Sequence, residues 1–95
     1  MPYIKEARRH IFDPSIKKVL KSMGEVDITK GDLNYICYRL GQGFIQQKGR
    51  NYQNITDATD GMMGAAGELE RRTLSPYEDE KIKENGDIHP FNPKL

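Results

Sequence analysis

Apolar residues recur along the chain with the three- and four-residue spacing of amphipathic α-helices. The first such stripe comprises Ile16, Val19, Leu20 and Met23. Asp13 and Pro14 come directly before it, and aspartate is favoured as an N-cap while proline is favoured at the first helical position. Gly24 follows the stripe and is a stop signal. We therefore predict a short helix between Pro14 and Gly24, preceded by an N-terminal arm of residues 1–12.

A second, longer stripe predicts a second helix. Its members are Leu33, Ile36, Cys37, Leu40 and Phe44. Thr29 stands three residues before Asp32, which is the spacing of a capping box with aspartate in place of glutamate. Gly49 marks the end of the pattern. Gly41 and Gly43 lie inside the helix, where they allow another backbone to approach closely.

The third stripe is small as well as apolar. It follows the segment 51–54, with Asn54 as the candidate N-cap, and comprises Ile55, Ala58, Met62, Ala65, Ala66 and Leu69. Small side chains let two helices pack tightly, so the partner is expected to be either the second helix or a second copy of the chain. The predicted oligomer interface consists of Gly61, Met62, Gly64 and Ala65.

Ser75 and Pro76 interrupt the pattern after the third stripe. They are either the cap and first residue of a fourth helical segment, 77–84, or a kink in one long helix. The segment 85–87 reads Asn-Gly-Asp and predicts the stop, and residues 88–95, with two prolines, predict an extended tail.

Together these patterns predict an all-α fold. Strand-like alternation is absent apart from a short piece at 2–5, so we expect one bundle-like domain of three to four helices over residues 1–95. A chain of 95 residues buries a small fraction of its surface, which favours a homo-oligomer.

Composition narrows the classes of function. Fifteen Lys and Arg against 14 Asp and Glu give a net charge of +1, so no global field favours nucleic acid or an anionic membrane. Cys37 is the single cysteine, which excludes an internal disulfide and disfavours a zinc site. No signal core or membrane-length apolar run occurs. We expect a cytoplasmic protein without metal or cofactor.

Three motifs resemble a family of short proteins of unknown function found in bacteriophage and prokaryotic genomes. They are GDLNY at 31–35, NYxNI at 51–55 and RRxxxPYEDxKIxENGD at 71–87. The resemblance implies a phage or mobile-element accessory protein, which would act in the host cytoplasm, and it implies no activity. The chain departs from the family's pattern in the third helix, where Met63 and a Gly/Ala-rich run replace a glutamate and bulky apolar residues.

The candidate ligand site lies beside the expected kink. A guanidinium group forms a planar fork that matches phosphate, and an aromatic ring nearby can stack on a base. The candidate ligand-binding residues are Glu68, Arg71, Arg72, Tyr77 and Asp79. The alternative is structural: one arginine pairs with Glu68 or Asp79, and the other is solvated.

We therefore expect a binding protein rather than an enzyme, which sequesters a phosphorylated nucleotide signal, including a cyclic one, at an oligomer interface. One alternative is a protein-protein inhibitor of a host factor. Another is a magnesium-dependent nucleotide pyrophosphohydrolase, because Asp57, Asp60, Glu68 and Glu70 lie on one helix, although the paired E-x-x-E and E-x-x-D segments of such enzymes are missing. Neither histidine stands near a nucleophile, and the basic N-terminal quarter lacks a helix-turn-helix signature.

Overall fold

The computed structural model describes residues 3–88, and helices make up nearly all of this range. In chain order these are α1 (Glu6–Gly24), α2 (Lys30–Lys48), α3 (Tyr52–Leu69), the π-helical turn η1 (Glu70–Leu74) and α4 (Ser75–Asn85). No strand occurs between residues 3 and 88, so the all-α prediction is confirmed. The predicted tail lies, apart from Ile88, outside the described residues. Within the same range, no helix combines the length and hydropathy of a membrane span.

Helix α1 begins earlier than predicted. It starts at Glu6 and runs through Pro14 in its interior, so Asp13 is not an N-cap and the helix occupies half of the predicted arm. Proline removes one helical N–H and crowds the carbonyl four residues before it, but it does not prevent a longer helix. Phe12 lies four residues before Ile16, so the apolar stripe continues on the N-terminal side of the proline. A continuous helix keeps that stripe on one face.

Local signals set the ends of α2 as predicted. The Thr29 hydroxyl accepts a hydrogen bond from the Asp32 N–H (3.2 Å), and the Asp32 carboxylate accepts one from the Thr29 N–H (2.9 Å). This reciprocal pair is the predicted capping box. At the other end Gly49 adopts φ 108°, a conformation that residues with a Cβ rarely adopt.

The turn between α2 and α3 corrects the predicted cap. Asn51 is the N-cap of α3, and its side chain accepts from the Asn54 N–H (2.8 Å). Asn54 has a different role: its side-chain amide donates to the carbonyls of Lys48 (3.2 Å) and Gly49 (2.9 Å). Asn54 therefore satisfies the free carbonyls at the end of α2 and ties the two helices together.

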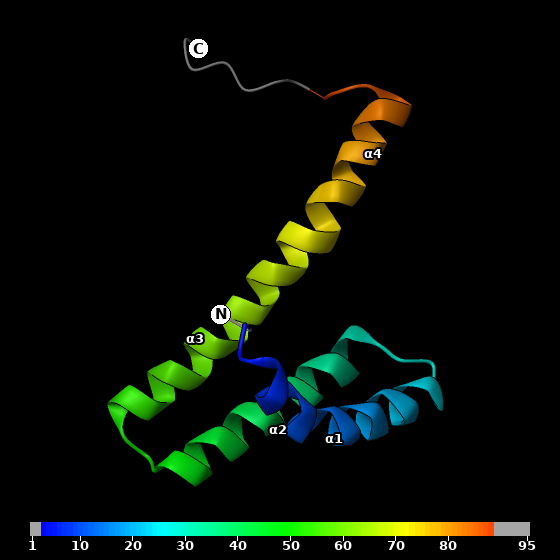
Figure 1. Cartoon of the computed structure of the whole chain (residues 1–95). Coiled ribbons are helices and arrows are strands. Elements are labelled where there is room, and N and C mark those ends of the chain that lie inside the picture. The colour runs from blue at the N-terminus through cyan, green and yellow to red at the C-terminus, as the bar shows by residue number, and fades with distance from the viewer. Residues whose placement is uncertain (1–2, 89–95) are drawn as a thin grey trace.

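The helices α3 and α4 form one rod, about 51 Å long at 1.5 Å per residue, which extends past the layer of α1 and α2 (Figure 1). Ser75 has helical φ and ψ angles and does not cap a separate helix, so of the two alternatives the structure adopts one long helix, with a π turn where the kink was predicted. The Ser75 N–H bonds to the Glu70 carbonyl five residues back, just before Pro76. A π turn next to a proline is a known way for a helix to adjust around the lost donor. The rod ends at Gly86 (φ 81°), as predicted.

Packing within the chain is sparse. Helix α3 packs against α2, and a Cβ placed on Gly41 would come 3.4 Å from the Met62 methyl group, so part of the small-residue face contacts α2. A Cβ on Gly61 would meet open space, so this position of the predicted oligomer interface stays available. No Cα of α1 lies within 8 Å of a Cα of α2, and α4 packs against no other helix than η1, to which it is joined.

As a result, no residue between 3 and 88 is buried, and 22 large apolar or aromatic side chains are exposed. The radius of gyration is 17.9 Å, whereas a compact domain of this length has about 12 Å. Cys37, predicted as a small core residue, is only half-buried. A single copy therefore lacks a closed hydrophobic core in this range.

Candidate functional site

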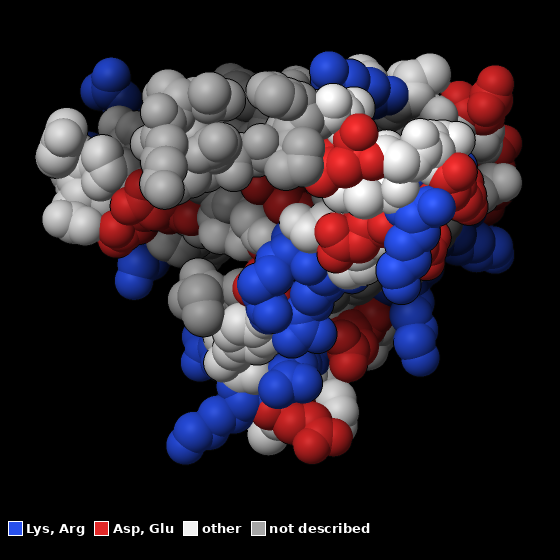
Figure 2. Space-filling view, turned by 90° about the horizontal axis from the view of Figure 1, so that it is seen from above, with Lys and Arg blue, Asp and Glu red and all other residues white. Residues whose placement is uncertain are grey.

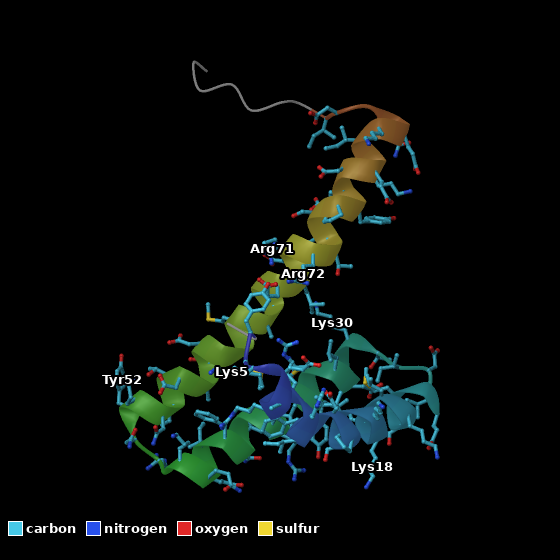
Figure 3. The ribbon with its side chains drawn as sticks, viewed as in Figure 1. Lys5, Lys18, Lys30, Tyr52, Arg71 and Arg72 are labelled. Carbon is cyan, nitrogen blue, oxygen red and sulfur yellow. The ribbon has the colours of Figure 1, made fainter. Side chains whose placement is uncertain are left out.

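Four side chains gather where α3 passes into η1, and we call them the Glu68 cluster. Glu68 comes from the last turn of α3, Arg71 and Arg72 come from η1, and Tyr3 comes from the segment before α1. Figure 3 shows Arg71 and Arg72 next to each other on the long rod, at the level where the N-terminal segment reaches it. The cluster thus joins the N-terminal segment to the junction of α3 and η1.

Hydrogen bonds connect all four members. Arg71 donates through Nε to Glu68 Oε1 (3.3 Å) and through Nη2 to Glu68 Oε2 (3.0 Å). Arg72 donates through Nε to Glu68 Oε2 (2.9 Å). The Tyr3 hydroxyl donates to Glu68 and accepts from Nη2 of Arg71 (2.6 Å) and of Arg72 (3.0 Å). One carboxylate and one phenol therefore hold two guanidinium groups together.

The local sequence explains this arrangement. Residues three and four positions apart are neighbours on a helix surface, so Arg71 and Arg72 can both reach back to Glu68. Tyr3 is held from its own side, because Arg9 Nε donates to the Ile4 carbonyl (2.8 Å) and fixes the segment that leads into α1. The Arg72 guanidinium carbon lies 5.4 Å from the centre of the Tyr3 ring, a cation–π distance.

The charges within the cluster stabilise one another. Hydrogen bonds from Arg71 first and then from Tyr3 lower the pKa of Glu68 from 4.5 to about 2; desolvation opposes them, and the bond from Arg72 adds a smaller lowering. The same contacts raise the pKa of both arginines. The side chain of Glu68 is only 17% exposed, whereas those of Arg71 and Arg72 are 63% and 61% exposed. The carboxylate is thus covered, and the arginines face solvent.

The structure brings together three of the five residues predicted as a ligand site. Glu68, Arg71 and Arg72 meet, and the predicted alternative, pairing with Glu68, applies to both arginines rather than to one. The other two residues, Tyr77 and Asp79, lie further along the rod in α4. Tyr77 has a different cation over its ring, Lys81 at 5.4 Å, and Lys81 also pairs with Glu84 (3.0 Å).

Sequence reasoning missed Tyr3. It lies 65 residues before Glu68, and no spacing rule connects positions so far apart. The signal was weak: an aromatic residue in a basic N-terminal stretch.

The acidic residues do not form a metal centre in the single chain. Between residues 3 and 88, no three His, Cys, Asp or Glu side chains lie close enough to hold a metal ion. Asp57 accepts a hydrogen bond from Gln53 (2.7 Å) on its own helix. One shallow groove between α1 and α2 and another between α2 and α3 are lined by no member of the Glu68 cluster.

Seen from above, Lys and Arg side chains gather near the middle of the molecular surface and are bordered by Asp and Glu (Figure 2). The face is therefore of mixed sign, in line with a net charge of +1. This pattern provides local contacts for a charged ligand but no large single-sign field.

Comparison with known proteins places the chain in a family. The model of a domain of unknown function, DUF6899, matches residues 1–88. The chain belongs to the DUF6899 family. The match covers all the described residues of this DUF6899 chain, including every member of the Glu68 cluster. No curated protein matches the chain, and no solved structure does.

Proposed function

We propose that this DUF6899 chain acts by binding, as a phage-type accessory protein whose Arg71 and Arg72 hold a phosphorylated ligand, most concretely a nucleotide. The observation that supports this proposal is the Glu68 cluster: two consecutive guanidinium groups are held side by side while both remain largely exposed. Sequestration of such a ligand requires affinity and no chemistry.

The arrangement leaves donors for a ligand. Within residues 3–88, Arg71 and Arg72 use only their Nε and Nη2 atoms for the bonds to Glu68 and Tyr3, so each Nη1 group stays available. Guanidinium N–H groups bind phosphate oxygens with charge-assisted hydrogen bonds. Because Glu68 and Tyr3 already restrict the arginine rotamers, less side-chain entropy is lost when a ligand binds.

A nucleotide also has a base, and Tyr3 can contribute there. Tyr3 is 47% exposed as a residue, and bases stack on aromatic rings at about 1–3 kcal/mol each. Glu68 neutralises one of the two arginines, so each cluster carries a net charge of about +1. If two copies place their clusters side by side, the shared site carries about +2, which suits a phosphodiester or a phosphomonoester.

One specific observation favours the second candidate, a protein-protein inhibitor. The exposure of 22 large apolar or aromatic side chains is typical of a surface that another protein covers. The third candidate, a magnesium-dependent hydrolase, draws no support from the carboxylates of residues 3–88, which do not converge within one copy.

Calorimetry and native mass spectrometry would test nucleotide binding. We expect the full-length protein to bind members of a panel of linear and cyclic nucleotides, and to release them intact. Arg71→Ala and Arg72→Ala should each weaken binding at least about tenfold, the loss expected for a charge-assisted hydrogen bond.

Arg39→Ala is the matched control. Arg39 also contacts a tyrosine, with Nη1 2.8 Å from the Tyr35 hydroxyl and the guanidinium carbon 5.8 Å from the ring, but no carboxylate or second arginine joins them. This variant should bind as the wild type does. The proposal would be contradicted if all three arginine variants lost the same affinity, or if the wild type bound no nucleotide. If the protein instead captures a host protein and Arg71→Ala does not change this capture, the result would favour the protein-protein inhibitor.

A further inference from the structure

Helix α4 is an arm without a partner in its own chain. Within the described residues it packs against nothing except η1, and it projects away from the other helices (Figure 1). The 11 residues of α4 lack tertiary packing within the described residues, although most of the stability of a helix in a protein comes from such packing. The arm therefore needs a surface to pack against.

The arm carries an apolar stripe suited to such packing. Leu74, Tyr77 and Ile82 recur at helical spacing and are 49%, 54% and 43% exposed. The π turn extends the stripe backwards: because the hydrogen bonds of η1 span five residues rather than four, Leu74 lies closer to the face of Leu69 than a regular α-helix would place it. The apolar side of α3 thus continues into the arm instead of rotating away from it.

A complementary surface lies between the first two helices. Since α1 stays more than 8 Å from α2 at the Cα level, a groove of about 290 Å³ remains between them. Its lining is mainly apolar and comprises Val19, Ser22, Met23, Val26, Ile28, Asp32, Tyr35 and Ile36. The groove is open to solvent in the single chain.

The chain's own arm cannot fill this groove, because α4 continues a rigid helix that leads away from it (Figure 1). A second copy can. Helix α1 carries five Lys and Arg against two Asp and Glu, a net +3, whereas α4 carries two Lys against four Asp and Glu, a net −2. The two elements therefore attract each other, and every copy offers one of each.

The exposed area of one copy is large enough for an interface with a second copy. The chain exposes 8894 Å², whereas a compact protein of its mass exposes about 5,600 Å². The nine residues outside the described range account for at most about 1,500 Å² at the value for extended chain. The remaining excess of about 1,800 Å² is more than twice the roughly 800 Å² per partner of a stable interface.

We propose that two copies exchange arms, so that α4 of each copy lies with Leu74, Tyr77 and Ile82 in the α1–α2 groove of the other. The exchange is reciprocal and closes with two-fold symmetry, since each arm meets one groove. This inference does not depend on nucleotide binding, and its test uses no ligand.

Site-directed cross-linking of mixed copies tests the exchange. In a Cys37→Ser background, one copy carries Met23→Cys in the groove, and a second copy with a tag of different mass carries Leu74→Cys, Tyr77→Cys or Ile82→Cys. A short bifunctional maleimide should join the two tags efficiently for at least one of these arm positions. Lys83→Cys, on the side of α4 away from the stripe, is the matched control and should give at least fivefold less product.

Assembly state provides the second measurement. The unmodified protein should be a dimer by native mass spectrometry, Ile82→Glu should weaken the dimer at least tenfold, and Lys83→Glu should not. High salt should also weaken it, because it screens the opposite charges of α1 and α4.

Three results would overturn the exchange. The protein could be a folded monomer at micromolar concentration, or the arm positions could give no more cross-linked product than the Lys83→Cys control. The third is that two copies with Gly61→Cys are cross-linked to each other while the arm and groove cysteines are not. Circular dichroism of each variant shows whether a loss of dimer reflects a loss of helix.

Discussion

Dilution alone should unfold this protein. No residue between 3 and 88 is buried in one copy, and in the exchanged dimer proposed above the free energy that holds the helices together comes from surfaces shared between copies. Folding and association are then one equilibrium, and lowering the protein concentration shifts it toward unfolded monomers.

The size of the effect follows from mass action. Each tenfold dilution lowers the free energy of a dimer by about 1.4 kcal/mol. For a cooperative unit of about 190 residues, 1 kcal/mol shifts the midpoint of thermal unfolding by about 2–4 °C. A 100-fold dilution should therefore lower Tm by about 5–11 °C.

Circular dichroism at 222 nm, recorded in cells of different path length at constant total absorbance, measures this shift directly. Ultracentrifugation at the same concentrations should show the dimer disappearing over the range in which Tm falls. A Tm independent of concentration, together with a helical monomer in the ultracentrifuge, would refute the reasoning, because a single copy would then be stable without a closed core.

Three further outcomes are expected. The pKa of Glu68 is about 2 in the folded protein, against 4.5 for a glutamate without these contacts. The stabilising contribution of the Glu68 carboxylate is therefore fully present above pH 4.5 and is lost as the pH falls toward 2. Glu68→Gln should remove this acid-dependent part of the profile of Tm against pH. Thr29→Ala should cost about 1 kcal/mol in urea unfolding, whereas Thr59→Ala, away from any cap, should cost less. Pro76→Ala should raise helicity and abolish the π turn, with a gain of up to about 3 kcal/mol, and an unchanged amide exchange pattern around residues 70–74 would contradict this.

Several features of the fold were predictable because their causes are local. The Thr29–Asp32 capping box, the stop at Gly49 and the stop at Gly86 depend on atoms within a few residues of one another. The same holds for the contact of Glu68 with Arg71 and Arg72, which follows from helical spacing.

Errors arose where two local rules competed. Asp13 and Pro14 form a good helix start, but Phe12 extends the apolar stripe past the proline, and the longer helix prevails. Asn54 looks like a cap by residue type, yet Asn51 takes that role, and Asn54 closes the end of α2. Residue type alone did not distinguish these alternatives.

By itself the sequence determined the helices, most of their ends and the pairing of one arginine with Glu68 as an alternative, since these depend on hydrogen bonds and spacing within one or two turns. Only the tertiary structure decided that Tyr3 completes the cluster from 65 residues away, that α1 leaves a groove beside α2, and that α4 packs against no other helix of residues 3–88 except η1. The physical reason is that these features depend on how helices lie relative to one another. Helix orientation is set by apolar packing, and packing in this chain is incomplete within a single copy.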